Sequence, residues 1–487
     1  MAICVIGVAQ QTTPSPGPAP EPLESWVRMA RAAEADSQAV GVLGALDSIQ
    51  VVFCQSWPYD DPTGRLSERL GINPRDTFYS GIGGTAPQQL LNDLAERMLG
   101  EEISVALVVG AEALATVRSA KQADTTLPWS HRDPVKKPFP YEGLPDKSEA
   151  AHELFHAWET FALWDNARRA REGIPLREYE AAIGKMMAPM TEVAARNPHA
   201  WRPRVRSPEE LSVATPTNRY IGFPHTRNEV SVLDVDMAAA VILATDEAAD
   251  ALGVPQTKRV YLSGWAFAKD PESISIREDM SRSTAMRIAT EAALTMADVT
   301  VHQLAAFDLY SCFPSALNFA CDVLNLDPLD KRGLTVTGGL PFAGGPSSCY
   351  LLHSVASMVE RLRADGGSGL VTGVGMHMTK HVAAVYSTSR PEQTAPVDAA
   401  LLQAQADTQI VHPQLGAVDG EGIVLAYTVA CDRDNVPAKG IVVVQMPSGR
   451  ALARVYEPGL LADMIANELV GRTVTLSTDG RLNTATW

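Results

Sequence analysis

Residues 78–91, FYSGIGGTAPQQLL, decide the fold of this chain. An apolar segment passes through Gly83-Gly84 into a helical pattern whose apolar face consists of Leu90, Leu91, Leu94 and Met98. The arrangement recurs at Gly344-Gly345, where the apolar face consists of Leu351, Leu352, Val355 and Val359. Each helix leads into a glycine-containing strand, residues 103–112 or 368–376. We interpret the recurrence as an ancient duplication, against the alternative that such glycine turns recur by chance.

Short apolar runs alternate with amphipathic helical patterns along most of the chain. This alternation predicts an α/β protein made of layered sheets and helices. The runs that we expect to form buried strands are residues 2–9, 48–54, 103–114, 259–268, 303–310, 368–376 and 382–388.

Changes in composition divide the chain into parts. We expect one half of the duplication to comprise residues 1–115 and 231–262, and the other to comprise residues 263–390. Residues 116–230 are rich in Trp, Pro, His and Arg and predict an inserted, mostly helical and looped domain. Beyond Pro391, residues 392–407 read as a linker, and short alternating strands follow. Residues 391–487 are therefore expected to form an additional C-terminal domain, a small OB-like β-barrel.

Composition restricts the classes of partner. The formal charge of −16 over 487 residues argues against broad binding to nucleic acids or anionic membranes, because both require a basic surface. The six cysteines are scattered and form no CxxC pair, which suits a reducing compartment. The apolar run at the start of the chain is too short to span a bilayer. We expect a cytoplasmic protein.

With these landmarks the chain resembles the thiolase superfamily, nearest to the sterol-carrier-protein type thiolases and to thiolase-like proteins with an extra C-terminal domain. The resemblance covers roughly residues 1–390, and its strongest pieces are the duplicated halves and residues 231–254, 307–319, 337–346 and 379–388. It implies a layered αβαβα fold of two βαβαβαββ halves, acetyl-CoA acetyltransferase-like chemistry in lipid metabolism, and a loop domain that covers coenzyme A (CoA).

The catalytic positions of that family hold glycine here. The nucleophilic cysteine corresponds to Gly83, with Gly84 one residue away, and the motif serine corresponds to Thr85. The activating histidine corresponds to Gly345, and the second cysteine corresponds to Gly373. Glycine supplies neither a thiol nor a base, so cysteine-dependent thiolase activity is not expected.

A binding pocket is expected to remain. The N–H groups at a helix start suit a thioester oxygen, a carboxylate or a phosphate. The resemblance implies CoA or acyl-CoA as the ligand, no tightly bound cofactor, no metal, and a monomer or a thiolase-like homodimer. The residues that we expect to contact the ligand are Gly83, Gly84, Thr85, Gly344, Gly345, Arg219 and His225.

Four side chains are candidates for altered chemistry. Tyr310 occupies the place of the family's fourth motif, and its phenol can donate to an oxyanion. His377 follows a strand where this fold places its catalytic loop, and Cys312 and Cys349 are substitute nucleophiles. Retro-aldol cleavage of a β-hydroxyacyl-CoA requires no acyl-enzyme, so Tyr310 and His377 offer an alternative function. The alternative hypothesis for each of these side chains is a purely structural role.

The motif His152-Glu153-Leu154-Phe155-His156 matches HExxH. On one helix, its two histidines could bind zinc and its glutamate could activate water, which gives a zinc hydrolase as a second alternative. No third ligand motif follows. The alternative interpretation of the motif is a structural helix on which the two histidines flank packed apolar side chains.

Overall fold

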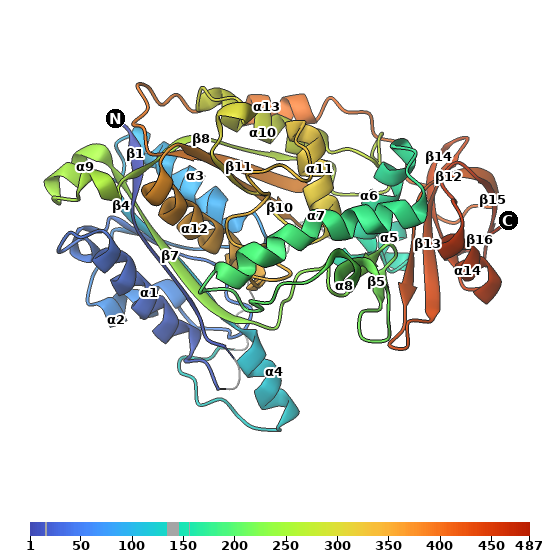
Figure 1. The fold of residues 1–487 in the computed structure, drawn as a ribbon, viewed down its shortest axis with the longest axis horizontal. Coiled ribbons are helices and arrows are strands. Elements are labelled where there is room, and N and C mark those ends of the chain that lie inside the picture. Colours follow the sequence, from blue (N-terminus) through green and yellow to red (C-terminus); the bar gives the residue numbers. More distant parts are fainter. Residues whose placement is uncertain (15–16, 134–145, 155) are drawn as a thin grey trace.

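The structure, a computed structural model, describes residues 1–14, 17–133, 146–154 and 156–487. Part of the predicted insert, residues 134–145, therefore lies outside the described residues. The expected α/β architecture is confirmed, and all seven predicted runs contain strands (Figure 1).

The first half of the sheet has the strand order β3-β2-β4-β7-β1. These strands span Ile3–Thr12 (β1), Ser48–Val51 (β2), Asp76–Tyr79 (β3), Val105–Ala113 (β4) and Asp236–Thr245 (β7). Almost every residue of β1, β4 and β7 is buried, because helices cover both faces of the sheet.

The second half repeats that order with four strands. Its order is β8-β11-β10-β9, and the strands span Val260–Lys269 (β8), Ala306–Asp308 (β9), Ser368–Gly375 (β10) and Lys380–Ser387 (β11). The strands β1 and β8 pair through Cys4 with Tyr261 and Val5 with Val260, which joins the halves into one nine-stranded sheet. The duplication read from the sequence is thus present in the strand order.

Two helices that follow the duplicated glycine pairs lie between the halves. They are α3 (Ala86–Leu99) and α12 (Tyr350–Asp365), which contact each other and strands of both halves. On the outer faces, α1 (Pro22–Asp36) packs on the first half and α10 (Thr284–Met296) on the second. The other helices of the two halves are α2 (Pro62–Leu70), α9 (Asp246–Ala251) and α11 (Pro314–Leu324), and α4 (Leu114–Gln122) runs from the first half into the predicted insert. This is the predicted αβαβα layering.

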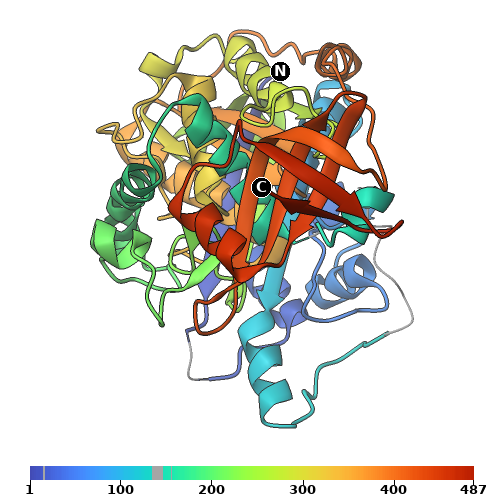
Figure 2. The same ribbon diagram turned by 90° about the vertical axis from the view of Figure 1, so that its right-hand side faces the viewer.

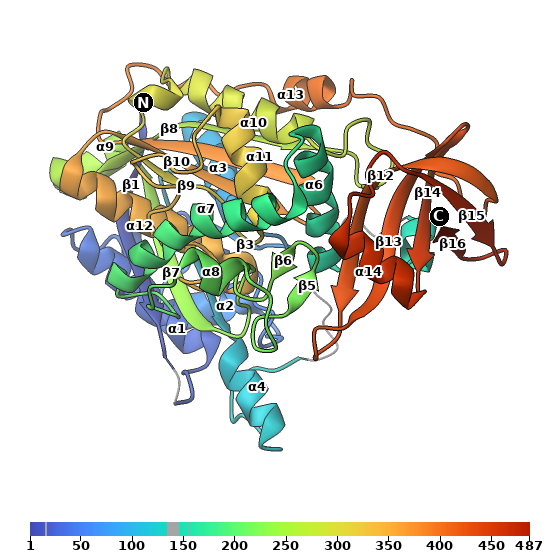
Figure 3. The ribbon, with the colours of Figure 1, turned by 45° about the vertical axis from the view of Figure 1, so that its right-hand side comes forward.

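The insert is helical and looped, as expected. Its elements are α5 (Lys147–Ala151), α6 (Ala157–Arg171), α7 (Leu176–Arg196), α8 (Pro208–Ser212), β5 (Tyr220–Gly222) and β6 (His225–Thr226). The rings of Phe161 and Phe313 stack with centroids 4.6 Å apart, which ties α6 to the segment that precedes α11. Figure 3 shows the insert between the sheet and the C-terminal domain.

The C-terminal domain is the expected closed β-barrel, with strand order β12-β13-β14-β16-β15 (Figure 2). Its strands span Gly420–Cys431 (β12), Pro437–Met446 (β13), Gly449–Val455 (β14), Thr473–Thr478 (β15) and Asn483–Thr486 (β16), and α14 spans Pro458–Ala466. The apolar core of the barrel also contains Leu176, Tyr220 and Phe223 of the insert. The barrel and the insert therefore share one core.

The expected linker contains a helix, so the reading of residues 392–407 as a plain linker was wrong. Asp398 caps α13 (Ala399–Ala406), whose alanine, leucine and glutamine residues favour a helix. The Gln403 amide bonds both the N–H and the C=O of Lys269, each at 2.9 Å, and thereby fixes α13 to the end of β8. Within the described ranges, no helix is both long enough and apolar enough to cross a membrane.

Candidate functional site

A cavity with a volume of about 360 Å³ lies at the start of α3. Its walls come from the loop before α3, from the first turns of α3 and from the adjoining ends of β8 and β11. The lining residues are Phe78, Ser80, Gly81, Ile82, Gly83, Thr85, Ala86, Gln89, Leu90, Phe267, Lys269 and Lys380. The predicted nucleophile position, Gly83, thus faces a cavity large enough for a small ligand.

Gly83 leaves space where a side chain would stand. A Cβ atom at this position would have a single near neighbour, the Thr85 Oγ1 at 3.9 Å. The Gly83 N–H donates to the Ser348 hydroxyl at 3.0 Å, and its C=O accepts from Ala86. Among the described residues, no hydrogen bond uses the N–H of Gly84 or Thr85. Both donors lie at the positive end of α3, which favours a carbonyl or anionic oxygen.

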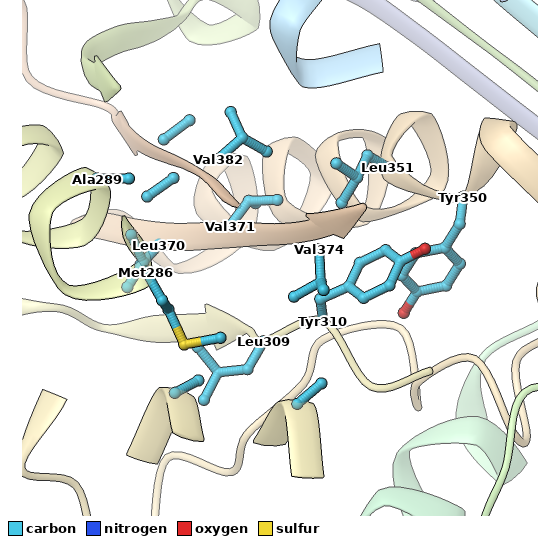
Figure 4. Close-up of a cluster of buried hydrophobic side chains, with 14 of the residues drawn as sticks. Met286, Ala289, Leu309, Tyr310, Tyr350, Leu351, Leu370, Val371, Val374 and Val382 are labelled. Carbon is cyan, nitrogen blue, oxygen red and sulfur yellow. The ribbon is translucent and has the colours of Figure 1, made fainter. Parts of the chain in front are cut away.

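Gly84 is required by close packing. A Cβ atom here would lie 2.3 Å from the Val374 carbonyl oxygen and 2.4 Å from the Tyr310 hydroxyl. The Tyr310 side chain is 6% exposed, and burial raises the pKa of its phenol well above the usual value. It remains a neutral donor beneath the first turn of α3, and its ring meets that of Tyr350 edge-on (Figure 4).

The space around Gly373, the predicted position of the family's second cysteine, is filled. A Cβ atom at Gly373 would lie 2.5 Å from Leu351 Cδ1 and 2.6 Å from Val382 Cγ1. Figure 4 shows both side chains packed around the strand β10. A cysteine cannot enter this position unless its neighbours move.

The space around Gly345, the predicted position of the activating histidine, is filled as well. A Cβ atom at Gly345 would lie 2.1 Å from the Ser231 hydroxyl oxygen, and the Gly345 N–H donates to the Val232 carbonyl at 2.9 Å. Gly344 has a φ of +112°, and a Cβ there would lie 2.6 Å from the sulfur of Met237. Both glycines, which we expected to contact ligand, pack against the segment that leads into β7.

His377 lies against the insert. Its Nδ1 is 3.2 Å from the Thr160 hydroxyl, and its carbonyl accepts from the Trp164 indole at 3.2 Å. Burial, with smaller contributions from His156 and Arg277, lowers the pKa of His377 to about 4, so the imidazole is neutral at pH 7. The structure thus ties His377 to α6, whereas Tyr310 packs beneath α3.

The hairpin that carries His377 is held in an unusual conformation. Met376 and Met378 have φ values of +56° and +60°, which side chains rarely adopt. The Met378 carbonyl accepts from the guanidinium of Arg277 at 2.8 Å and lies 3.2 Å from His381 Nε2. These contacts fix the backbone directly after His377.

The two candidate thiols are not activated. Burial raises the pKa of the Cys312 thiol and of the Cys349 thiol well above the usual value, so the thiolate is disfavoured at both. The Cys349 side chain is 1% exposed, and its sulfur packs against Gly110 of β4.

Arg219 and His225, expected to contact CoA, are engaged inside the protein. The Arg219 guanidinium donates to the Cys431 carbonyl of the barrel at 3.0 Å. His225 is fully buried, with its Nε2 2.5 Å from an Asp165 oxygen. Neither residue lines the cavity at Gly83.

The prediction that one helix carries the whole HExxH motif is wrong. Phe155 of the motif lies outside the described residues. Helix α5 ends at Ala151, and His156 is the extended residue before α6. His152 Nε2 accepts from the Asn483 N–H at 3.1 Å, and Glu153 pairs with Lys439 and Arg454 of the barrel. Within the described ranges, no three His, Cys, Asp or Glu side chains are grouped so that they could hold a metal ion. His152 and Glu153 thus join the insert to the barrel.

Lys269 and Lys380 line the cavity but were not predicted as site residues. Antiparallel pairing of β8 with β11 places them opposite each other. The sequence holds no signal for this contact, because the register of two distant strands brings the lysines together.

The duplicated sheet, the two central helices and the cavity at the start of α3 define a thiolase fold. The crystal structure of a monomeric SCP2-thiolase-like protein type 1 from Mycobacterium smegmatis matches 100% of this chain and 99% of its own, with 31% identity and a TM-score of 0.87. Residues 401–481 match the family of the thiolase-like protein type 1 additional C-terminal domain. A comparison with curated proteins finds no match. The chain belongs to the thiolase superfamily, among the SCP2-thiolase-like proteins of type 1.

Proposed function

We propose that this protein binds CoA or an acyl-CoA thioester in lipid metabolism and does not carry out the cysteine-dependent thiolase reaction. The opening at Gly83 carries the proposal, because the thioester of a ligand could approach the start of α3 where a cysteine side chain would otherwise stand. The packing at Gly345 and Gly373 supports the second part, since it leaves no room for the histidine and cysteine of that reaction.

The arrangement at α3 suits a thioester oxygen. The N–H groups of Gly84 and Thr85 and the positive end of the helix can donate to it. A cavity of about 360 Å³ is at the small end of ligand sites, so it would hold the acyl end of the ligand while the nucleotide of CoA lies outside.

Calorimetric titration with CoA and acetyl-CoA tests the binding. We expect saturable binding, which Gly83→Leu weakens at least about tenfold by filling the cavity. Gly44→Leu is the matched control, because Gly44 also has open space around its Cβ position but does not line the cavity. An absence of heat at millimolar ligand would refute the proposal. Thiolysis of acetoacetyl-CoA should not exceed the background rate.

We also propose that the protein is a monomer. The full-length match to a protein described as monomeric supports this. Light scattering should give a mass near 52.2 kDa, and a concentration-independent mass of twice that value would contradict it.

A further inference from the structure

A second cavity adjoins the one at Gly83. Its volume is about 280 Å³, and its walls come from α3, from β8 and from residues 397–402, which include the start of α13. Gln89 and Phe267 line both cavities, so the two meet at these side chains. The two cavities therefore form one groove that begins at Gly83 and ends at α13.

The groove follows the contact between α3 and β8. Its lining residues on α3 extend from Ala86 to Glu96, and the Trp265 indole of β8 donates to the Glu96 carboxylate at 3.2 Å at the far end. Ten residues of an α-helix span about 15 Å. An extended hydrocarbon chain, with C–C bonds of about 1.5 Å, advances roughly 1.25 Å per carbon. The groove thus has the length of an acyl chain of about twelve carbons.

The far end of the groove is enclosed by apolar side chains. Residues of the segment 397–402 line it on one side, and the ring of Phe267 lines it on the other. Leu402 is only 9% exposed and belongs to the main apolar core. The Gln403 amide, next in the chain, bonds both the N–H and the C=O of Lys269. Because these contacts fix α13 to β8, the helix forms a permanent wall of the groove.

The charges at the far end disfavour an anionic group. Asp93 and Glu96 of α3 line the second cavity, and none of the described residues in its lining is Lys, Arg or His. The nearest cation that pairs with Asp93 is Arg97, at 3.9 Å. An acyl chain that ended in a carboxylate would meet like charges there, so an uncharged chain end fits this part of the groove best.

We propose that the acyl group of the bound thioester lies along this groove, with the thioester at Gly83, the methylenes between Gln89 and Phe267, and an uncharged end at α13. The ligand is then a thioester of a linear acyl chain of up to about twelve carbons, and α13 limits its length. This inference rests on the proposed function and adds the class of acyl group. Because α13 overlaps the start of the matched residues 401–481, the additional C-terminal part of the chain would contribute directly to ligand selection.

Calorimetry with thioesters of increasing chain length tests the inference. Hexanoyl-CoA, dodecanoyl-CoA and hexadecanoyl-CoA, each below its micellar concentration, differ only in the number of methylenes. We expect dodecanoyl-CoA to bind at least about tenfold more tightly than hexanoyl-CoA, because each buried methylene adds to the affinity. Hexadecanoyl-CoA should bind within about threefold of dodecanoyl-CoA, since its last carbons would lie beyond the groove.

A bulky side chain on α13 should shorten the groove. Ala399 and Ala400 are both exposed, and of the two Ala399 lines the cavity. Ala399→Trp should lower the affinity for dodecanoyl-CoA at least about tenfold relative to hexanoyl-CoA. Ala400→Trp is the matched control and should leave the ratio of the two affinities unchanged. Because both alanines are exposed, we expect both variants to fold.

The possible results separate the inference from the proposed function. If CoA and all three thioesters bind equally, the groove holds no acyl chain, which overturns the inference and leaves the proposed function intact. If the affinity rises with chain length but Ala399→Trp changes the ratio no more than Ala400→Trp does, the chain lies elsewhere and the inference also fails. If no CoA ester binds, the proposed function fails, and S-dodecanoyl-N-acetylcysteamine, which lacks the nucleotide, then decides: binding that Ala399→Trp weakens supports the acyl groove, and no binding refutes it.

Discussion

The hydroxyl of Tyr310 lies 2.4 Å from the point where a Cβ atom of residue 84 would stand. A tyrosine hydroxyl can occupy this place only if residue 84 is a glycine. A tyrosine at position 310 fits beneath α3 because residue 84 has no side chain, and the close approach keeps the phenol next to the cavity wall at Gly83.

We predict that Gly84→Ala destabilises the fold by about 1–3 kcal/mol, because the added methyl overpacks a site bounded by the Tyr310 hydroxyl and the Val374 carbonyl. Gly83→Ala, one residue earlier, should change the free energy of unfolding by less than about 0.5 kcal/mol. Adding Tyr310→Phe to Gly84→Ala should recover part of the loss, since one of the two contacts disappears. Urea unfolding measures all four proteins, and equal stability of the two alanine variants would disprove the packing argument.

A thiol can be returned to position 83. We predict that Gly83→Cys folds normally and reacts with one equivalent of an alkylating reagent, because its side chain would enter the cavity. Five of the six native cysteines are buried, so the wild type should react far more slowly. Bound acyl-CoA should protect the introduced thiol and should not protect the thiol of the control variant Gly44→Cys. Mass spectrometry measures the fraction of alkylated protein. If bound acyl-CoA does not slow the alkylation of Gly83→Cys, the acyl-CoA binds elsewhere.

The pH dependence of stability should report on His377. Its pKa of about 4 lies below the value of 6.5 for an unperturbed histidine, so the unfolded chain binds more protons between these values. The contribution of His377 to stability is therefore complete above pH 6.5 and is lost as the pH falls toward 4. Because the side chain is partly exposed, we expect about 1–2 kcal/mol.

Urea unfolding at pH 7 and pH 4.5 tests this expectation. The fall in the free energy of unfolding should be smaller in His377→Gln than in the wild type. His302→Gln, at an exposed position, should behave as the wild type does. If the free energy of unfolding falls as much in His377→Gln as in the wild type, His377 is not neutral in the folded state.

Removal of the barrel should disrupt the insert. A chain of residues 1–390 would expose Leu176, Tyr220 and Phe223, which share the core of the barrel, and would leave the Asn166 amide without its Tyr427 partner. We expect this fragment to aggregate and to bind a hydrophobic dye. Arg219→Ala in the full chain should only lower the free energy of unfolding by about 1 kcal/mol. A monomeric fragment with the full-length melting temperature would contradict the shared core.

The fold could be predicted in detail because buried strands are continuous apolar runs and because the duplication repeats its glycine pairs. That Gly83 takes the place of the family's nucleophile stays a prediction from its motif, and the structure adds that a cavity adjoins this residue. The partners of polar side chains were not readable. His152, Arg219 and His225 bind distant backbone or buried groups, and Lys269 meets Lys380 through strand register. The helix α13 was missed because the prolines before it suggested a linker.

The packing at Gly373 bears on the evolutionary history of this chain. Leu351 and Val382 would have to become smaller before a cysteine could be accommodated there, and Ser231 would have to give way to a histidine at position 345. None of these changes increases turnover until a cysteine also stands at position 83, and each lowers stability meanwhile. Selection would remove the intermediates one by one. A descendant of this protein could therefore change its ligand far more easily than it could acquire the cysteine-dependent reaction.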